Sequence, residues 1–292
     1  MIIGSHFSEY DGAATSRCER ALVTLLGDVG SPWRERIVLV GGLVPRYLIG
    51  ALPPDVPPHV GTTDIDLALS LVVPEGGDEA YRTLESNLKK SGFARGDASF
   101  RWARTIDGVT VVIEFLCEVQ DGGEGGRIHK PHSQKEGNLG ALQVRGCSIV
   151  ERDCVIRRVE AERLNGGRSA VEVRVCGLTA FLSLKIDAFQ DRHKAKDAYD
   201  LVFTLLNWPD GPAGAAAEVS VAPTRDDPFV DNALRVMGER FVDQAQDGPV
   251  MYSTFVCDLD ADPEERARQR LTAVDAVQIF LAALAQRRAE HV

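Results

Sequence analysis

Two aspartates that stand one residue apart inside an apolar run, Asp64 and Asp66, are the residues of this chain best suited to chemistry. Along a β-strand successive side chains alternate between faces, so both carboxylates are expected on one face. Ile65, Leu67 and Leu69 are expected on the other face, in a core. Two like charges on one face repel each other unless a cation lies between them. Oxygen ligands of this kind suit Mg²⁺ or Mn²⁺, so the pattern predicts a metal site.

A pair of glycines, Gly41-Gly42, directly follows a short apolar stretch at residues 37–40 and stands upstream of the aspartates. Glycines leave the backbone open to close approach, and the free N–H groups at the start of a following helix attract phosphate. A tight turn alone is the commoner explanation of a Gly-Gly pair after a strand. The position of this pair ahead of Asp64 and Asp66 favours a site for a triphosphate.

The segments between residues 37 and 73 follow a specific order: an apolar strand, a Gly-Gly turn, a helix, a loop, and a strand with Asp-x-Asp. In this order the chain resembles the nucleotidyltransferase superfamily with a polymerase-beta-type palm. The resemblance implies an α+β fold, namely a mixed-sheet nucleotidyltransferase palm with an added strand segment and a C-terminal helical region. It also implies a third carboxylate on a neighbouring strand.

Glu114, in the middle of the apolar run 111–116, is the best candidate for that third carboxylate. A glutamate inside an apolar strand needs a partner, and a metal ion shared with Asp64 and Asp66 would provide one. The superfamily more often has an aspartate at this place, so the glutamate is a small departure from its pattern.

Two alternatives to a metal-binding Glu114 stay open. Glu118 has the same parity along the strand and is an alternative ligand. In the other alternative, Glu114 forms an ion pair with Arg101 or Arg104 on the preceding strand.

A second group of charged residues lies on two expected helices near the middle of the chain. Lys185 and Arg192 share a face of the first helix, and Asp197 and Asp200 share a face of the second. The two cations are suited to the charge of a triphosphate, with the aspartates orienting them. A salt bridge between the two helices is the alternative interpretation, and by itself this second group favours it.

The order of these residues narrows the resemblance. Lys185, Arg192 and the run Lys196-Asp197-x-x-Asp200-Leu201 follow the Gly-Gly pair and Asp-x-Asp along the chain. Here the chain resembles the AbiEii-type nucleotidyltransferase toxins of bacterial toxin–antitoxin and abortive-infection systems. The run Thr63-Asp64-Ile65-Asp66-Leu67 also fits the variant of Asp-x-Asp found in that family. The resemblance covers residues 37 to about 206.

The resemblance implies a reaction and a set of site residues. A nucleoside triphosphate, ATP among the candidates, gives its nucleoside monophosphate to an acceptor hydroxyl, and pyrophosphate leaves. The acceptor is a tRNA 3′ end, or a serine or threonine hydroxyl where a protein is modified, and a cognate antitoxin protein is the expected partner. The implied catalytic residues are Asp64, Asp66, Glu114, Lys185 and Asp200. The implied metal ligands, for Mg²⁺ or Mn²⁺, are Asp64, Asp66 and Glu114. The implied nucleotide-binding residues are Gly41, Gly42, Thr63, Lys185 and Arg192.

Composition limits the class of protein. The chain has 292 residues with 44% hydrophobic content, which is typical of a globular protein with a core. It has no apolar run long enough to cross a bilayer and no secretory signal, and its six scattered cysteines have no Cys-x-x-Cys pair. We therefore expect a cytoplasmic protein with reduced thiols, no zinc site and no membrane partner.

The formal net charge of −10 weighs against a generic nucleic-acid binder. The arginines between residues 152 and 174 are numerous enough to form a local basic groove, and solvated strand edges are the alternative.

Periodicity and turn residues predict most elements. Helices are expected at 15–26, 43–49, 78–91, 178–192, 196–206, 231–244 and 264–287. Strands are expected at 37–40, 63–73, 100–106 and 109–119, the last two joined by a turn at Asp107-Gly108. The predicted organisation is a nucleotidyltransferase core (1–125), a strand extension with the charged helices (126–207), a Pro-, Gly- and Ala-rich linker (208–230) and C-terminal helices (231–292).

Two other functions stay open beside the toxin. The same chemistry on a small molecule, as in aminoglycoside-modifying enzymes, is mildly favoured by the acidic net charge. A non-catalytic nucleotide-binding or partner-binding module is disfavoured, because a protein that only binds has no need of three carboxylates around one metal.

Overall fold

The computed structural model describes residues 6–10, 12–30, 33–69, 78–120, 123–130 and 139–290. The chain forms two compact units, each assembled from separated stretches. We call residues 12–44 and 61–176 the sheet unit, and residues 1–11, 45–60 and 177–292 the helical unit. The domain boundaries predicted at residues 125, 207 and 230 stay a prediction.

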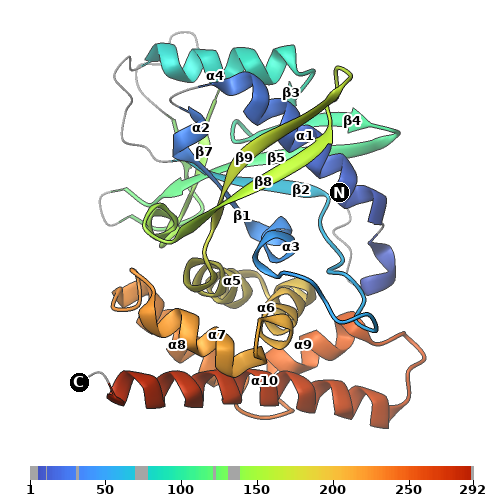
Figure 1. Ribbon diagram of the computed structural model, residues 1–292, viewed down its shortest axis with the longest axis vertical. Helices are drawn as coiled ribbons and strands as arrows, with labels where there is room; N and C mark the ends of the chain where they lie inside the picture. The colour runs from blue at the N-terminus through green and yellow to red at the C-terminus, as the bar shows by residue number, and fades with distance from the viewer. Residues whose placement is uncertain are drawn as a thin grey trace. The chain divides into compact units, whose positions relative to one another are not determined.

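The sheet unit is built on one mixed sheet, as the predicted α+β class requires (Figure 1). Its strands are β1 (Ile37–Val40), β2 (Asp64–Leu69), β3 (Ala94–Arg95), β4 (Arg101–Ile106), β5 (Val109–Glu118), β6 (Ile128–His129), β7 (Ala141–Val144), β8 (Cys154–Glu162) and β9 (Arg168–Cys176). The main path runs β3-β4-β5-β2-β1-β9-β8, and β7 pairs with β5 and β6. β2 lies between antiparallel β1 and parallel β5, at the centre of this order.

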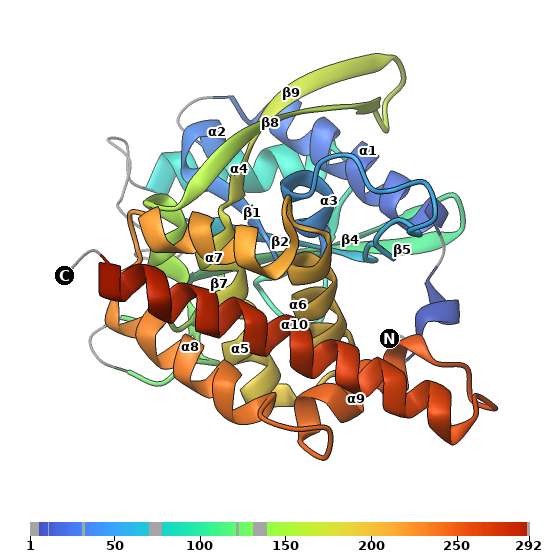
Figure 2. The ribbon, with the colours of Figure 1, turned by 60° about the horizontal axis from the view of Figure 1, so that its bottom comes forward.

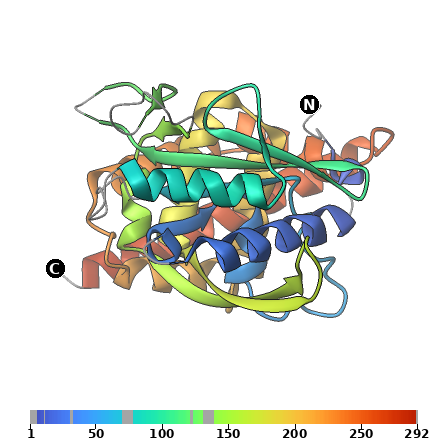
Figure 3. The ribbon, with the colours of Figure 1, turned by 90° about the horizontal axis from the view of Figure 1, so that it is seen from above.

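Helices cover the sheet and connect its strands. They are α1 (Gly12–Val29), α2 (Trp33–Arg36) and α4 (Asp78–Lys90), with 3₁₀ turns η2 (Gly41–Leu43) and η3 (Cys147–Glu151). α1 packs on β2, β5, β8 and β9, and α4 lies beside it (Figure 3). Leu22 and Leu25 of α1 are fully buried, because residues spaced three or four apart share the helix face that meets the sheet.

The β4–β5 hairpin confirms the predicted turn. Asp107 and Gly108 both have positive φ angles, 49° and 80°. Such a two-residue turn matches the natural twist of the two strands, and aspartate and glycine tolerate its backbone. Its register places Arg101 of β4 opposite Glu114 of β5.

The helical unit contains η1 (Phe7–Glu9), α3 (Pro45–Leu48), α5 (Leu178–Arg192), α6 (Ala195–Asn207), α7 (Gly211–Val221), α8 (Pro228–Arg240), α9 (Asp247–Val256) and α10 (Pro263–Glu290). α5 and α6 pack against each other, and the long α10 packs against α7 and α9 (Figure 2). In the part of the chain that the structure describes, no helix is both long and apolar enough to cross a membrane.

Three details differ from the predictions. Residues 208–230 are not an irregular linker throughout, because α7 occupies 211–221 and buries Ala215 and Ala216; alanine favours helix even where no apolar period marks it. The predicted helix at 43–49 is present but shorter, as α3 at Pro45–Leu48, and the 3₁₀ turn η2 precedes it. The predicted strand 63–73 is β2 up to Leu69, and its last residues lie outside the described ranges.

Candidate active site

Asp64 and Asp66 lie on one face of β2, as the alternation of the strand predicts. Ile65 and Leu67 between and after them are fully buried, whereas both aspartates are half-buried. The two carboxylates therefore face away from the core. The backbone N–H of Asp64 donates to Thr62 Oγ1 at 3.2 Å. Thr63, the predicted nucleotide-binding residue, is half-buried just before the strand.

The turn after β1 lies directly beside Asp66. β1 and β2 are antiparallel with Val40 opposite Asp66, so the next residue, Gly41, meets the aspartate side chain. A Cβ atom added to Gly41 would lie 1.9 Å from Asp66 Oδ2, and the φ angle of Gly41 is +74°. Glycine is therefore required at position 41 for two reasons: the positive φ angle, and the overlap that a Cβ atom would have with Asp66. The predicted link between the Gly-Gly pair and the aspartates is a physical contact.

Glu114 stands in the same row as Asp66 across the sheet. β2 and β5 are parallel with Asp66 opposite Glu114, so the two side chains share a face. Arg101 lies opposite Glu114 on the other side, and its Nε donates to Glu114 Oε1 at 2.6 Å. The ion-pair alternative is therefore present with Arg101, whereas Arg104 donates to the Ser91 carbonyl.

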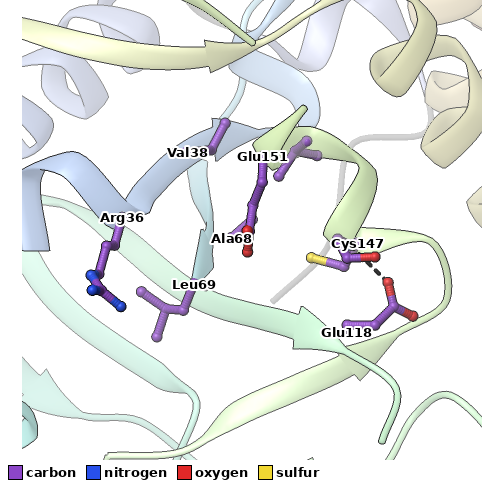
Figure 4. A pocket seen from close by; sticks show the side chains of 9 residues that line it. Arg36, Val38, Ala68, Leu69, Glu118, Cys147 and Glu151 are labelled. Atoms are coloured by element: carbon purple, nitrogen blue, oxygen red, sulfur yellow. Dashed lines mark hydrogen bonds between the residues drawn. The ribbon is translucent and has the colours of Figure 1, made fainter. Parts of the chain in front are cut away.

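Glu118, the alternative ligand, has a structural task. Its Oε1 accepts the N–H groups of Val119 and Gly146, and its Oε2 accepts that of Ser148 at 2.7 Å. The carboxylate thereby caps the start of η3 beside Cys147 (Figure 4). The cavity next to it measures about 30 Å³, which suits a water molecule and not a nucleotide.

The carboxylates of β2 fit a divalent cation by their chemistry and surroundings. Asp64 and Asp66 offer hard oxygen donors on one face, and the lack of a side chain at Gly41 lets the Asp66 carboxylate lie against the bare backbone of the turn. Within the described ranges, no three His, Cys, Asp or Glu side chains converge as a ready-made metal site. This agrees with the engagement of Glu114 by Arg101, and the role of Glu114 as third ligand stays a prediction.

Cys18 of α1 lies next to this site. Its Sγ donates to the Thr62 carbonyl at 3.3 Å. Burial raises the pKa of the Cys18 thiol far above its ordinary value, and the charges of Asp64 and Asp66 raise it further. The thiol stays protonated, so it is not a nucleophile.

The second group of charged residues forms an ion-pair network inside the helical unit. Lys185 Nζ of α5 lies 3.0 Å from Asp197 Oδ1 and 2.7 Å from Asp200 Oδ2. Arg192 binds Asp197 with Nε at 2.7 Å and with its terminal nitrogen at 2.8 Å. The salt bridge between helices that was the alternative interpretation therefore exists, and it joins α5 to α6.

Two further residues belong to this network: Lys196, which the sequence pattern included without assigning it a contact, and His59, which no sequence pattern indicated. Lys196 Nζ lies 2.8 and 3.0 Å from the two oxygens of Asp200, and His59 Nε2 lies 2.8 Å from Asp200 Oδ1. Lys196 stands four residues before Asp200, and this helical spacing is a signal that was available. His59 is 141 positions away from Asp200, and no local pattern predicts that contact.

Burial and charge set the protonation of the network. Burial disfavours the charge of Asp200, which is 0% exposed, but Lys185 and Lys196 hold its pKa well below the usual range. Burial likewise opposes the charge of Lys185, yet Asp200 and Asp197 raise its pKa above the ordinary value. Burial lowers the pKa of Lys196. It also lowers that of His59 to about 4, so the imidazole is neutral at pH 7.

The arginines between residues 152 and 174 do not favour a basic groove. Arg163 pairs with Asp28, and Arg158 pairs with Glu160 at 2.7 Å. These two acidic partners offset part of the positive charge that phosphate binding needs, which weighs toward the solvated-edge interpretation.

The fold and the site together define a class of protein. A mixed sheet in which a Gly-Gly turn touches the second aspartate of an Asp-x-Asp strand is the arrangement expected of a nucleotidyltransferase. The family model described as "Nucleotidyl transferase AbiEii toxin, Type IV TA system" matches residues 24–278. The chain belongs to this family of toxin–antitoxin nucleotidyltransferases. No curated protein matches the chain.

Proposed function

We propose that this protein transfers a nucleoside monophosphate from a nucleoside triphosphate to an acceptor hydroxyl, with Mg²⁺ or Mn²⁺ bound by Asp64, Asp66 and Glu114. One observation carries the proposal: the Asp66 carboxylate is packed against Gly41, a position where a side chain would overlap the carboxylate. The proposal places the triphosphate on this bare backbone, so that its cation meets the carboxylate pair beside it.

The residues of the sheet unit hold the triphosphate and leave its α-phosphorus open to attack. Gly41 and Gly42 present bare backbone to phosphate oxygens, with Thr63 at the edge of the same strand end. When bound, the cation neutralises phosphate charge and acidifies the attacking hydroxyl. That hydroxyl gives its proton to solvent water, its oxygen bonds to the α-phosphorus, and the bond to pyrophosphate breaks.

In this proposal Lys185 and Arg192 balance the charge of the triphosphate, and Asp200 holds Lys185. The raised pKa of Lys185, which arises because Asp200 and Asp197 outweigh the effect of burial, supports this role by keeping the ammonium charged. Arg192 supports it through exposure, since 47% of its side chain is accessible although two of its nitrogens bind Asp197.

The family supports a toxin role, and we propose a cytoplasmic toxin whose acceptor is a tRNA 3′ end or a protein hydroxyl and whose activity a cognate antitoxin restrains. The test incubates the protein with each α-³²P-labelled NTP, Mg²⁺ and either total tRNA, a cell-protein extract or an aminoglycoside panel. Label in RNA or protein supports the proposal. Label confined to a drug identifies a small-molecule transferase instead, and label in no acceptor contradicts the proposed activity.

A further inference from the structure

His59 is a buried imidazole at the end of the irregular stretch that follows α3 in the helical unit. Only 3% of its side chain is exposed, and a buried imidazole needs a hydrogen-bond partner. The chain continues from His59 directly through Val60 and Gly61 to Asp64. His59 therefore shortly precedes the strand of the two aspartates along the chain.

One stripe of α6 receives this segment. Tyr199 stacks on the His59 ring at 5.2 Å with an interplanar angle of 28°, and Phe203 meets it edge-on at 5.0 Å. The hydroxyl of Tyr199 accepts the backbone N–H of Val60 at 3.3 Å. Asp200, the next residue of the helix, accepts a hydrogen bond from the imidazole Nε2 at 2.8 Å. Phe203 is four residues after Tyr199 and three after Asp200, so it shares a side of α6 with each of them.

The Asp200 carboxylate accepts hydrogen bonds from three donors. His59 and Lys196 bind its Oδ1, and Lys185 and Lys196 bind its Oδ2. Because the carboxylate is ionised, the imidazole nitrogen that faces it carries the proton, and a neutral His59 supplies a donor without adding a cation. Together with Lys196, the imidazole thus limits rotation of the carboxylate and keeps Oδ2 directed at Lys185.

We propose that His59 is a positioning residue for nucleotidyl transfer: its Nε2–H orients Asp200, and through Asp200 the Lys185 ammonium, while its ring anchors the segment that leads into Asp64. This role rests on the proposed function. His59 touches neither nucleotide nor metal in this account, and it acts through Asp200 and the backbone.

Two substitutions separate hydrogen bonding from packing. His59→Phe keeps an aromatic ring between Tyr199 and Phe203 but removes the donor, whereas His59→Gln keeps an N–H donor at the same reach but removes the ring. The control is His6→Gln, because His6 Nε2 lies 2.8 Å from the Cys257 carbonyl, away from the Asp200 network. Each variant is assayed for transfer from α-³²P-NTP and for its melting temperature.

We expect kcat/KM to fall about 10- to 100-fold in His59→Phe, because this variant loses a hydrogen bond to a charged group. In His59→Gln, which keeps a donor, we expect most of the wild-type kcat/KM to be retained. His6→Gln is expected to retain wild-type kcat/KM. If the phenylalanine variant is as active as wild type, or more active than the glutamine variant, packing alone is the role and the proposal is wrong.

Hydrogen exchange at Val60 provides a readout that does not depend on activity. Faster exchange is expected in His59→Gln, which lacks the ring, than in His59→Phe, which keeps it, and equal exchange in the two would contradict the anchoring role. An inactive wild-type protein would overturn the proposed function, whereas an active wild type with equally active variants would overturn the role of His59 only.

Discussion

Glu114 has two roles to distinguish, as the proposed third metal ligand and as the ion-pair partner of Arg101. It stands beside Asp66 on one side and is bound by Arg101 on the other. A carboxylate with two oxygens can serve an arginine and a cation at once, so the ion pair is compatible with a share in metal binding. The two roles make different demands on Arg101, and substitutions can tell them apart.

We expect Glu114→Gln to lower kcat/KM on the order of 100-fold, because a lost metal ligand removes several kcal/mol of charge stabilisation. Arg101→Gln should have a much smaller effect on activity. It should also cost less than about 1 kcal/mol in unfolding free energy, because 40% of the Arg101 side chain is exposed and solvent screens the pair. Equal losses of activity in both variants would show that Glu114 serves only the ion pair.

At the scale of elements, the turn between β1 and η2 connects backbone conformation to the site. Gly41→Ala adds a methyl group that overlaps Asp66 in a positive-φ residue, whereas Gly108→Ala adds it at φ +80° with no atom within 4 Å. Both substitutions carry a backbone cost of about 1–2 kcal/mol. We therefore expect backbone strain to destabilise Gly41→Ala and Gly108→Ala by similar amounts. Gly41→Ala alone should lose further stability and nucleotide transfer, because its methyl group overlaps Asp66. Urea unfolding and the transfer assay measure both, and an active Gly41→Ala protein would contradict the contact.

The pairing of α6 with the His59 segment predicts how stability depends on pH. An unfolded histidine has a pKa near 6.5, and that of His59 is about 4 because burial outweighs the attraction of Asp200. Between these values the unfolded chain binds a proton that the folded chain does not. Stability should therefore fall as pH drops from 6.5 to 4, by up to about 1.4 kcal/mol per unit.

Among the described residues, the charged groups that shift the pKa of His59 are Asp200, Lys196 and Lys185, and the ring of Tyr199 stacks on the imidazole. The stability contributed by Asp200, whose pKa Lys185 and Lys196 hold low against the effect of burial, is lost only below pH about 4. The matched measurement is urea unfolding of wild type and His59→Gln across the range. A wild-type slope that persists unchanged in His59→Gln would contradict the assignment.

Local sequence patterns predicted the elements that local physics determines. The strand Ile37–Val40 and the helix Leu178–Arg192 have the predicted bounds, since an apolar run ended by glycine and a start after Gly177 mark them. The Asp-x-Asp strand has the predicted alternation of buried and half-buried residues. Long-range pairing escaped prediction: nothing local indicates that β9 lies parallel beside β1, or that His59 binds Asp200.

At the scale of the whole molecule, the family match includes stretches of both units, so the carboxylates and the Lys185 network both belong to the shared family region. The net charge of −10 implies that an RNA acceptor would be held by local contacts, because the overall field repels it. For the strand of the two aspartates, we propose that Asp64 and Asp66 support transfer of the nucleotide itself and not of the terminal phosphate.

The most direct test compares α-³²P-NTP with γ-³²P-NTP as donor, for wild type, Asp66→Asn and the control Asp107→Asn. Asp107 is a turn residue whose positive φ an asparagine tolerates. We expect wild type and Asp107→Asn to transfer the α label and not the γ label. We expect Asp66→Asn, folded with an unchanged melting temperature, to transfer neither. Transfer of the γ label, or undiminished transfer by folded Asp66→Asn, would contradict the proposal.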